Sequence, residues 1–145
     1  MAIIGIIAEY NPFHTGHEYH IARSRELLGA DSTVICVMSG DFVQRGEAAL
    51  YSKFARAEAA CRCGADLVIE LPLPWALSSA EGFARGAVGL LGALGAAHLS
   101  FGSECGDVQR LERIAENLID PAVNAEISRE LNENANNSYA SARQT

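Results

Sequence analysis

Two histidines, His14 and His17, are the residues best suited to chemistry, and they enclose Thr15 and Gly16 directly after an apolar run. At a spacing of three they project from the same side of the first turn of a helix. Each neutral imidazole carries one N–H donor, and the positive end of a helix favours that neutral form. Gly16 lacks a Cβ, so a flat base or a ribose can lie directly on the backbone. The pattern predicts a phosphate-binding turn at a helix N-terminus.

Other interpretations of these histidines remain open at this stage. Histidines that only cap the helix or lie on its surface would have the same spacing. His20 continues the same face, where a structural histidine held by hydrogen bonds is more common. A metal site built from His14, His17 and His20 would need a further ligand, and no nearby cysteine or paired carboxylate completes it. We therefore assign no metal ligands.

A second polar loop, residues 38–53, follows the next apolar run and should lie at the same edge of the sheet. Lys53 and Arg56 fall on one face of the helix after it, which predicts a cationic pair that acts on anionic oxygens during catalysis. Arg45 can reach the same place from the loop. Residues 44–62 hold four basic and two acidic residues, so an anionic ligand fits this region. The alternative is a solvated basic face.

The ends of the third and fourth apolar runs carry further candidates. Phe101 and Gly102 can flank an adenine, with the Gly102 backbone approaching it closely. Glu70 is expected to be a hydrogen-bonded structural acid. Trp75 is expected to be a core or interface residue rather than a platform for a base.

The elements that position these residues follow from the apolar pattern. Four short runs read as strands, and helical patterns separate them; the strands are residues 2–8, 33–38, 66–71 and 97–101, and the helices are residues 16–28, 52–63 and 79–94. Runs that are apolar on both faces suit a parallel sheet covered on both sides. Strands that alternate with helices imply right-handed βαβ units. The sequence predicts an α/β fold, a Rossmann-like parallel sheet flanked by helices.

The predicted helices also have expected contact faces and a domain boundary. The first helix is expected to pack through Tyr19, Ala22 and Leu27, and the second through Phe54, Ala57 and Cys61. A further amphipathic helix is expected at residues 107–119. We place the ligand-binding domain at residues 1–120, and we interpret residues 121–145 as the helical start of a truncated C-terminal region.

Composition narrows the class of protein. The chain has 145 residues and a net charge of −7, which argues against a general nucleic-acid-binding surface. The four cysteines show no zinc-site spacing and suit a reduced, cytoplasmic protein. No apolar run is long enough for a membrane span. We infer no obligatory protein partner.

Five ordered blocks of the sequence carry a resemblance to a known family. They are residues 8–17 (AEYNPFHTGH), 38–47 (MSGDFVQRGE), 64–72 (GADLVIELP), 79–87 (SAEGFARGA) and 100–104 (SFGSE). H-x-G-H after the first strand marks the nucleotidyltransferase superfamily that includes the class I aminoacyl-tRNA synthetases. The five blocks together resemble the N-terminal part of the bacterial tRNA(Met) cytidine acetate ligases.

The resemblance implies a reaction and a set of ATP contacts. ATP, with Mg²⁺ on its phosphates, and acetate would form acetyl-adenylate, whose acetyl group passes to the wobble cytidine of elongator tRNA(Met). The same resemblance implies that ATP contacts the loop of residues 7–20 and one later glycine: Ile7, Ala8, Glu9, Tyr10, Asn11, Pro12, Phe13, His14, Thr15, Gly16, His17, Glu18, Tyr19, His20 and Gly102. Family members are considerably longer than this chain.

Two rival functions use the same residues. A small-molecule adenylyltransferase of the same superfamily would also need the histidine turn, although the block at residues 38–47 argues against it. A non-catalytic module that binds a nucleotide or tRNA would keep the fold without turnover. Pyrophosphate release that depends on acetate separates these from the ligase.

Overall fold

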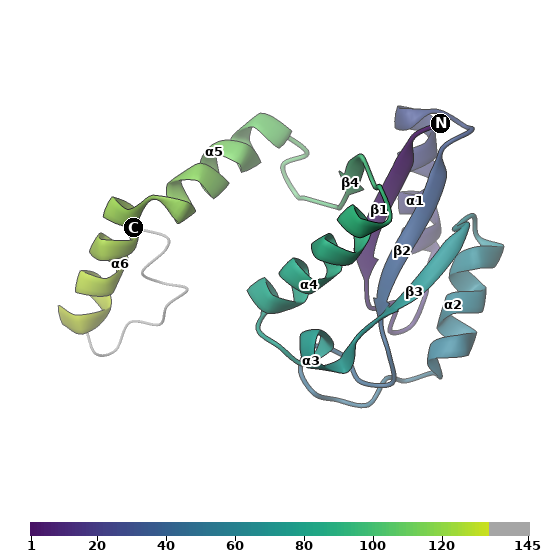
Figure 1. The fold of residues 1–145 in the computed structure, drawn as a ribbon, viewed down its shortest axis with the longest axis horizontal. Helices are drawn as coiled ribbons and strands as arrows, with labels where there is room; N and C mark the ends of the chain where they lie inside the picture. Colours follow the sequence, from purple (N-terminus) through teal and green to yellow (C-terminus); the bar gives the residue numbers. More distant parts are fainter. Residues whose placement is uncertain (134–145) are drawn as a thin grey trace. The chain divides into compact units, whose positions relative to one another are not determined.

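The computed structural model describes residues 1–133, which contain a parallel four-stranded sheet. The strands lie in the order β3-β2-β1-β4 (Figure 1), with the bounds β1 Ile3–Ala8, β2 Thr33–Ser39, β3 Leu67–Leu71 and β4 His98–Ser100. All strand pairs are parallel, so every carboxyl end lies at the same edge. The predicted strands are confirmed to within one residue at each end.

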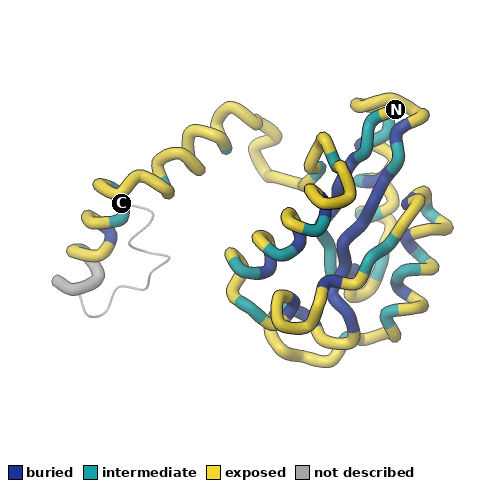
Figure 2. Tube along the Cα trace, viewed as in Figure 1, coloured by how far each residue is buried: buried dark blue, intermediate teal, exposed yellow. Residues whose placement is uncertain are grey.

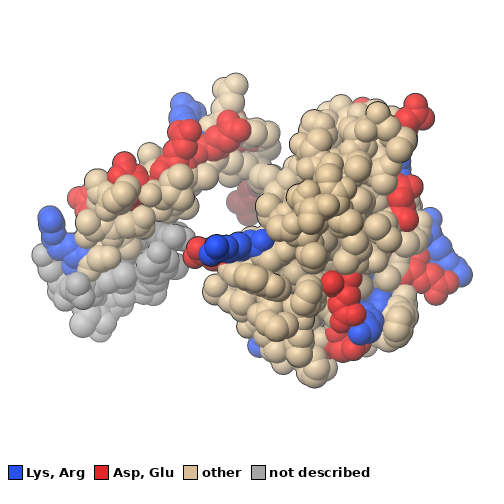
Figure 3. All heavy atoms as spheres, viewed as in Figure 1, with Lys and Arg blue, Asp and Glu red and all other residues tan. Residues whose placement is uncertain are grey.

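Helices cover both faces of the sheet (Figure 1). One face holds α1 Thr15–Leu28 and α2 Lys53–Arg62, and the other holds α3 Leu73–Ala76 and α4 Ala80–Ala93. The three longer helices confirm the prediction. The four-residue α3 was not predicted, because it is too short for a periodic pattern. Figure 3 shows few charged side chains over α4, whose only charged residues are Glu81 and Arg85.

The core consists of two apolar clusters, one on each face of the sheet. Figure 2 shows that the central strands between them are buried. Strand β2 contributes alternate residues to each, because successive side chains of a strand point to opposite faces. Val34 and Cys36 pack toward α1 and α2, whereas Ile35 and Val37 pack toward α4. The result is a strand buried on both faces, as its unbroken apolar run predicts.

The predicted contact faces of α1 and α2 are wrong at most positions, although Ala57 of α2 packs against the core as predicted. Tyr19 and Leu27 are each 68% exposed and Phe54 is 76% exposed. The buried residues are instead Ile21 and Ser24 of α1, and Arg56 and Ala60 of α2. Two of these four are polar. Their buried polar atoms are satisfied by hydrogen bonds, so a search for apolar residues at helical spacing misses them.

The chain divides into two compact units, Met1–Gly102 and a second unit that begins at Ser103. The second unit contains α5 Val108–Ile119 and α6 Pro121–Glu133, which contact each other. This boundary precedes the predicted one at residue 120, because α5 associates with α6. Residues 134–145 of the predicted C-terminal region lie outside the described residues. No helix within residues 1–133 has both the length and the apolar character to cross a membrane.

Candidate functional site

The histidine turn joins the carboxyl end of β1 to α1, as predicted. His14 is the N-cap residue of α1, and its Nδ1 accepts a hydrogen bond from the Gly16 N–H at 3.1 Å. The Nδ1 of His17 accepts from the His14 N–H at 3.2 Å, which closes a capping box. The two rings stack with centroids 3.7 Å apart and planes at 27°. The expectation that both rings lie on the same side of the first turn is confirmed.

These caps also fix which ring nitrogens carry protons. A backbone N–H can only donate, so each Nδ1 must be unprotonated and each neutral ring carries its hydrogen on Nε2. Within Met1–Gly102 neither Nε2 has a hydrogen-bond partner. Burial, followed by the neighbouring His14 and His20, holds the pKa of His17 below its ordinary value. The turn therefore presents two N–H donors side by side, with His17 in its neutral form near pH 7.

Gly16 has a structural role that differs from the predicted one. A Cβ at this position would lie 2.9 Å from Cε1 and 3.1 Å from Nδ1 of His14. The glycine therefore makes room for the capping imidazole.

Tyr10 supports the turn from within the core. It is 2% exposed and has a φ of 48°, an unusual value for a residue other than glycine. Its hydroxyl lies 3.2 Å from the Cys36 Sγ, and burial raises its pKa. The ring meets Phe13 and His17 edge-on, each at 4.9 Å between centroids. Tyr10 was predicted to contact ATP, and in the structure it is a buried support for His17.

Two further residues of the predicted ATP loop bind the loop after β2. The Glu9 Oε1 accepts from the Gln44 N–H at 2.6 Å, and the Asn11 Oδ1 accepts from the Leu50 N–H at 2.7 Å. Their side chains therefore join the two loops at the carboxyl edge of the sheet. The sequence offers no local signal for these contacts, since the partners are 35 and 39 residues apart.

His20 belongs to a hydrogen-bonded chain between α1 and β4. The Ser24 hydroxyl donates to the His20 carbonyl at 2.8 Å, so it must accept from the Ser100 hydroxyl at 2.7 Å. Ser100 then accepts from the His20 Nε2 at 2.8 Å. Burial lowers the pKa of His20. His20 thus has the hydrogen-bonded contacts that a structural histidine would have.

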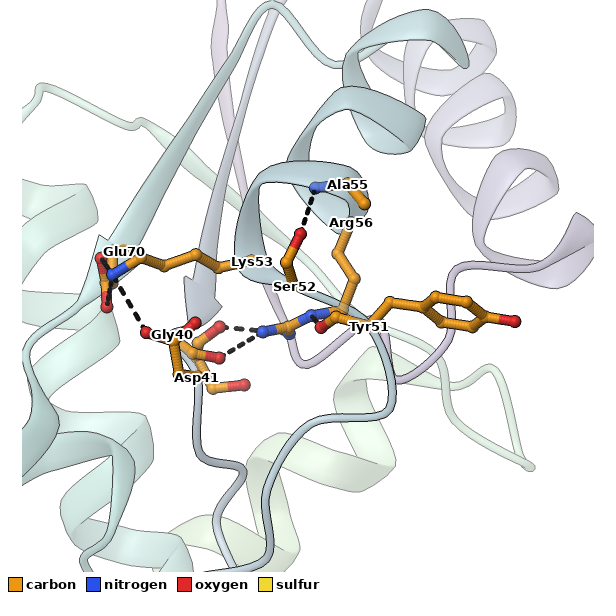
Figure 4. Close-up of polar contacts among 9 residues, drawn as sticks. Gly40, Asp41, Tyr51, Ser52, Lys53, Ala55, Arg56 and Glu70 are labelled. Carbon is orange, nitrogen blue, oxygen red and sulfur yellow. Dashed lines mark hydrogen bonds and ion pairs between the residues drawn. The ribbon is translucent and has the colours of Figure 1, made fainter.

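Lys53 forms ion pairs at the carboxyl ends of β2 and β3 (Figure 4). Its Nζ lies 2.8 Å from the nearer Glu70 carboxylate oxygen and 3.4 Å from Asp41. The hydrogen bond to Glu70 raises the pKa of Lys53. Glu70 is therefore the hydrogen-bonded structural acid that we expected.

Arg56 has different partners (Figure 4). Its guanidinium is buried and donates to four backbone carbonyls: Glu9 at 2.6 Å, Tyr51 at 3.1 Å, Ser39 at 3.2 Å, and Gly40. Burial lowers its pKa. Lys53 and Arg56 therefore have separate acceptors, and the structure does not bring them together as the predicted cationic pair.

The other residues predicted to contact the ligand are half-buried or exposed. Ile7 and Ala8 are half-buried at the end of β1, Thr15, Glu18 and Tyr19 are exposed on α1, and Arg45 is exposed on the second loop. Gly102 is exposed, with open space where a Cβ would lie. Trp75 is 42% exposed and packs on Gly86 of α4.

A groove of about 370 Å³ opens beside the histidine turn. The sequence analysis did not predict it, because its lining comes from segments far apart in the chain. Pro12 and Phe13 form one side. Tyr51 and the small residues Ala55 and Ala59 of α2 form the other, with Arg56 also in the lining.

Comparison with known proteins agrees with this geometry. The model of the HIGH Nucleotidyl Transferase family matches residues 1–145. The chain belongs to this family.

Relatives of this HIGH nucleotidyl transferase chain share one name. A tRNA(Met) cytidine acetate ligase of Syntrophotalea carbinolica is 56% identical over 118 residues, 81% of this chain and 28% of the relative. One of Acetivibrio thermocellus is 54% identical over 121 residues, 83% of this chain and 29% of the relative. The resemblance to these ligases is confirmed, and the chain spans less than a third of their length.

Solved structures confirm the fold of this HIGH nucleotidyl transferase chain. Thermotoga maritima TmcAL bound with alpha-thio ATP superposes with a TM-score of 0.87 at 44% identity, over 99% of this chain and 35% of that one. The apo form of the same protein gives 0.88 over 34% of its length.

Proposed function

We propose that this chain is the ATP-binding part of a tRNA(Met) cytidine acetate ligase. The observation that carries the proposal is the stacked histidine pair at the N-terminus of α1, whose Nδ1 atoms accept backbone N–H groups and so leave both Nε2–H groups available as donors. The names of the relatives and the ATP analogue in the Thermotoga maritima structure support it. The tRNA substrate suggests a cytoplasmic protein.

The proposed reaction has two steps. An acetate oxygen attacks the α-phosphorus of ATP, the bond to the bridging oxygen breaks, and pyrophosphate leaves with its electron pair. The exocyclic amine of the wobble cytidine then attacks the acetyl carbon, AMP leaves, and the amine loses a proton. The first step needs charge stabilisation and alignment more than a nucleophilic side chain.

The histidine turn suits the first step. Negative charge grows on the α-phosphate oxygens and on the departing pyrophosphate, and N–H donors that are already oriented stabilise it. His14 and His17 supply two such donors, and the free N–H groups of α1 add a partial positive charge. Mg²⁺ would neutralise further phosphate charge when bound.

The other predicted contacts divide into two groups. Backbone groups of residues 7–20 and of Gly102 are proposed to line the nucleotide. Lys53 is proposed as a cation near the phosphates, since its side chain remains 26% exposed beside Glu70. The guanidinium of Arg56 is bonded to four backbone carbonyls, so Arg56 is proposed to act through the loops.

The test is acetate-dependent exchange between ATP and labelled pyrophosphate. It is run on this chain and on a fusion that adds the remaining part of the Thermotoga maritima protein. We expect His17→Ala to reduce exchange by about 10²- to 10³-fold, the usual effect of losing one oxyanion donor. The thermal midpoint should fall little, because the capping bond that is lost is exposed. His98→Ala is the matched control, since His98 is exposed at the amino end of β4.

Three results would contradict the proposal. Equal losses of exchange and stability in His17→Ala would make the histidine structural. Exchange that requires a phosphorylated acceptor instead of acetate would indicate a small-molecule adenylyltransferase. ATP binding without any exchange in the fusion would indicate a non-catalytic nucleotide-binding module.

A further inference from the structure

Arg56 is a buried cation held by backbone carbonyls alone. It is 1% exposed, and its hydrogen-bond acceptors are the carbonyls of Glu9, Ser39, Gly40 and Tyr51. No carboxylate within Met1–Gly102 accepts a hydrogen bond from it. Burial of an arginine is unfavourable unless its donors are satisfied. The planar guanidinium offers five donors in a fixed geometry, which a lysine cannot reproduce.

The four acceptors belong to the two loops at the carboxyl edge of the sheet. Glu9 follows β1 and precedes the histidine turn, whereas Ser39 and Gly40 lie where β2 ends. Tyr51 lies just before α2. One side chain therefore joins the loop after β1 to both ends of the loop after β2. Figure 4 shows the Gly40 and Tyr51 ends of the second loop beside Arg56.

The hydrogen bond from Arg56 to the Glu9 carbonyl connects Arg56 to His17 through Tyr10. The Glu9 carbonyl belongs to the peptide that precedes Tyr10, whose φ of 48° is strained for a residue with a Cβ. Such a conformation persists only where its surroundings hold it. The Tyr10 ring in turn packs edge-on against His17 at 4.9 Å. A carbonyl fixed by Arg56 thereby sets where the Tyr10 ring, and with it the His17 ring, lies.

We propose that Arg56 is a positioning residue for the histidine turn: through the Glu9 carbonyl and Tyr10 it holds the His17 ring in register with His14 and with the loop after β2. Its effect on turnover rests on the proposed function. Its effect on the imidazoles does not.

Arg25 provides a matched control at the opposite edge of the sheet. Its guanidinium donates to the carbonyls of Ser32, of Ala30 at 3.3 Å and of Gly64 at 2.9 Å. It also pairs with Asp66 at 2.5 Å. Arg25 thus ties chain segments together as Arg56 does, but far along the strands from the histidine turn.

The experiment compares Arg56→Lys with Arg25→Lys in the full chain. Long-range ¹H–¹⁵N spectra of the imidazoles report ring environment and tautomer, urea unfolding reports stability, and pyrophosphate exchange reports turnover. We expect both variants to lose stability. Only Arg56→Lys should move the His14 and His17 imidazole signals and lower exchange at least tenfold, through kcat more than through the KM for ATP.

The outcomes separate this inference from the proposed function. Shifted imidazole signals in Arg56→Lys support the positioning role even if the wild-type chain shows no exchange, a result that would count only against the ligase reaction. Imidazole signals of Arg56→Lys identical to those of the wild type would overturn the positioning role. The same signals displaced equally by Arg25→Lys would also overturn it, since the effect would then be general destabilisation.

A second variant covers the case in which Arg56→Lys does not fold. Arg56 lines the groove beside Pro12 and Phe13, so added ethylguanidinium can reach the space left by Arg56→Ala. Return of the native imidazole signals with ethylguanidinium supports the inference. A refolded chain whose imidazole signals stay displaced overturns it, as does an Arg56→Ala chain that keeps native signals without the additive.

Discussion

Replacing Gly16 by alanine should separate the chemistry of the histidine turn from its stability. The new Cβ would meet the His14 ring at 2.9 Å, and the ring, as the free end of a side chain, would rotate away. The Gly16 N–H then loses its acceptor, at a cost of about 1 kcal/mol. Alanine in place of glycine in a helix returns about 0.5–1 kcal/mol. The net change in unfolding free energy should stay within about 0.5 kcal/mol.

Gly16→Ala should reduce pyrophosphate exchange far more than it changes the unfolding free energy. A rotated His14 no longer holds its Nε2–H beside that of His17. Complete loss of one such donor reduces the rate by about 10²- to 10³-fold, so displacement should cost at least about tenfold. Urea unfolding measures the first quantity and pyrophosphate exchange measures the second.

Gly89→Ala is the control for helix propensity. Gly89 lies within α4, where a Cβ meets nothing within 4 Å. The unfolding free energy of Gly89→Ala should rise by about 0.5–1 kcal/mol, and its pyrophosphate exchange should not change. Wild-type exchange in Gly16→Ala would refute the reasoning about His14. A loss of stability above about 2 kcal/mol would show that the ring cannot rotate away.

Three further measurements follow from the same structure. Burial lowers the pKa of His17 and His20 below 6.5, so the unfolded chain binds more protons just below that pH. The stability that these neutral imidazoles contribute should be fully present above pH 6.5 and should be lost as the pH falls through the pKa values of the folded chain. Urea unfolding of His20→Gln should show a shallower decline of stability with falling pH. A Cβ in Gly86→Ala would lie 2.5 Å from the Trp75 ring, so stability should fall by about 1–3 kcal/mol and the fluorescence of this single tryptophan should shift. Burial raises the pKa of Cys36 to about 11, so a thiol reagent should label it only after unfolding.

The sequence by itself determined the elements and the centre of the site. Unbroken apolar runs predicted β1 and β2, because a strand buried on both faces has no polar alternation to obscure it. The more exposed β3 and β4 were predicted from shorter runs that alternate with helical segments. Ser52 and Gly64 marked the ends of α2 through local capping and backbone freedom. The spacing of His14 and His17 placed both rings on one turn, since i and i+3 neighbours on a helix share a face.

The tertiary structure alone decided what surrounds that centre. Arg56 and the Glu9 carbonyl are 47 residues apart, and no periodic pattern relates them. The burial of Arg56 on α2 was missed for the same reason. A guanidinium whose donors are satisfied by distant carbonyls can occupy a helix position where periodicity predicts an apolar residue. Tyr10 likewise became a buried support only through the ring of His17 and the thiol of Cys36. Local patterns report a residue's own helix or strand, whereas hydrogen-bond partners across the sheet edge exist only once the chain has folded.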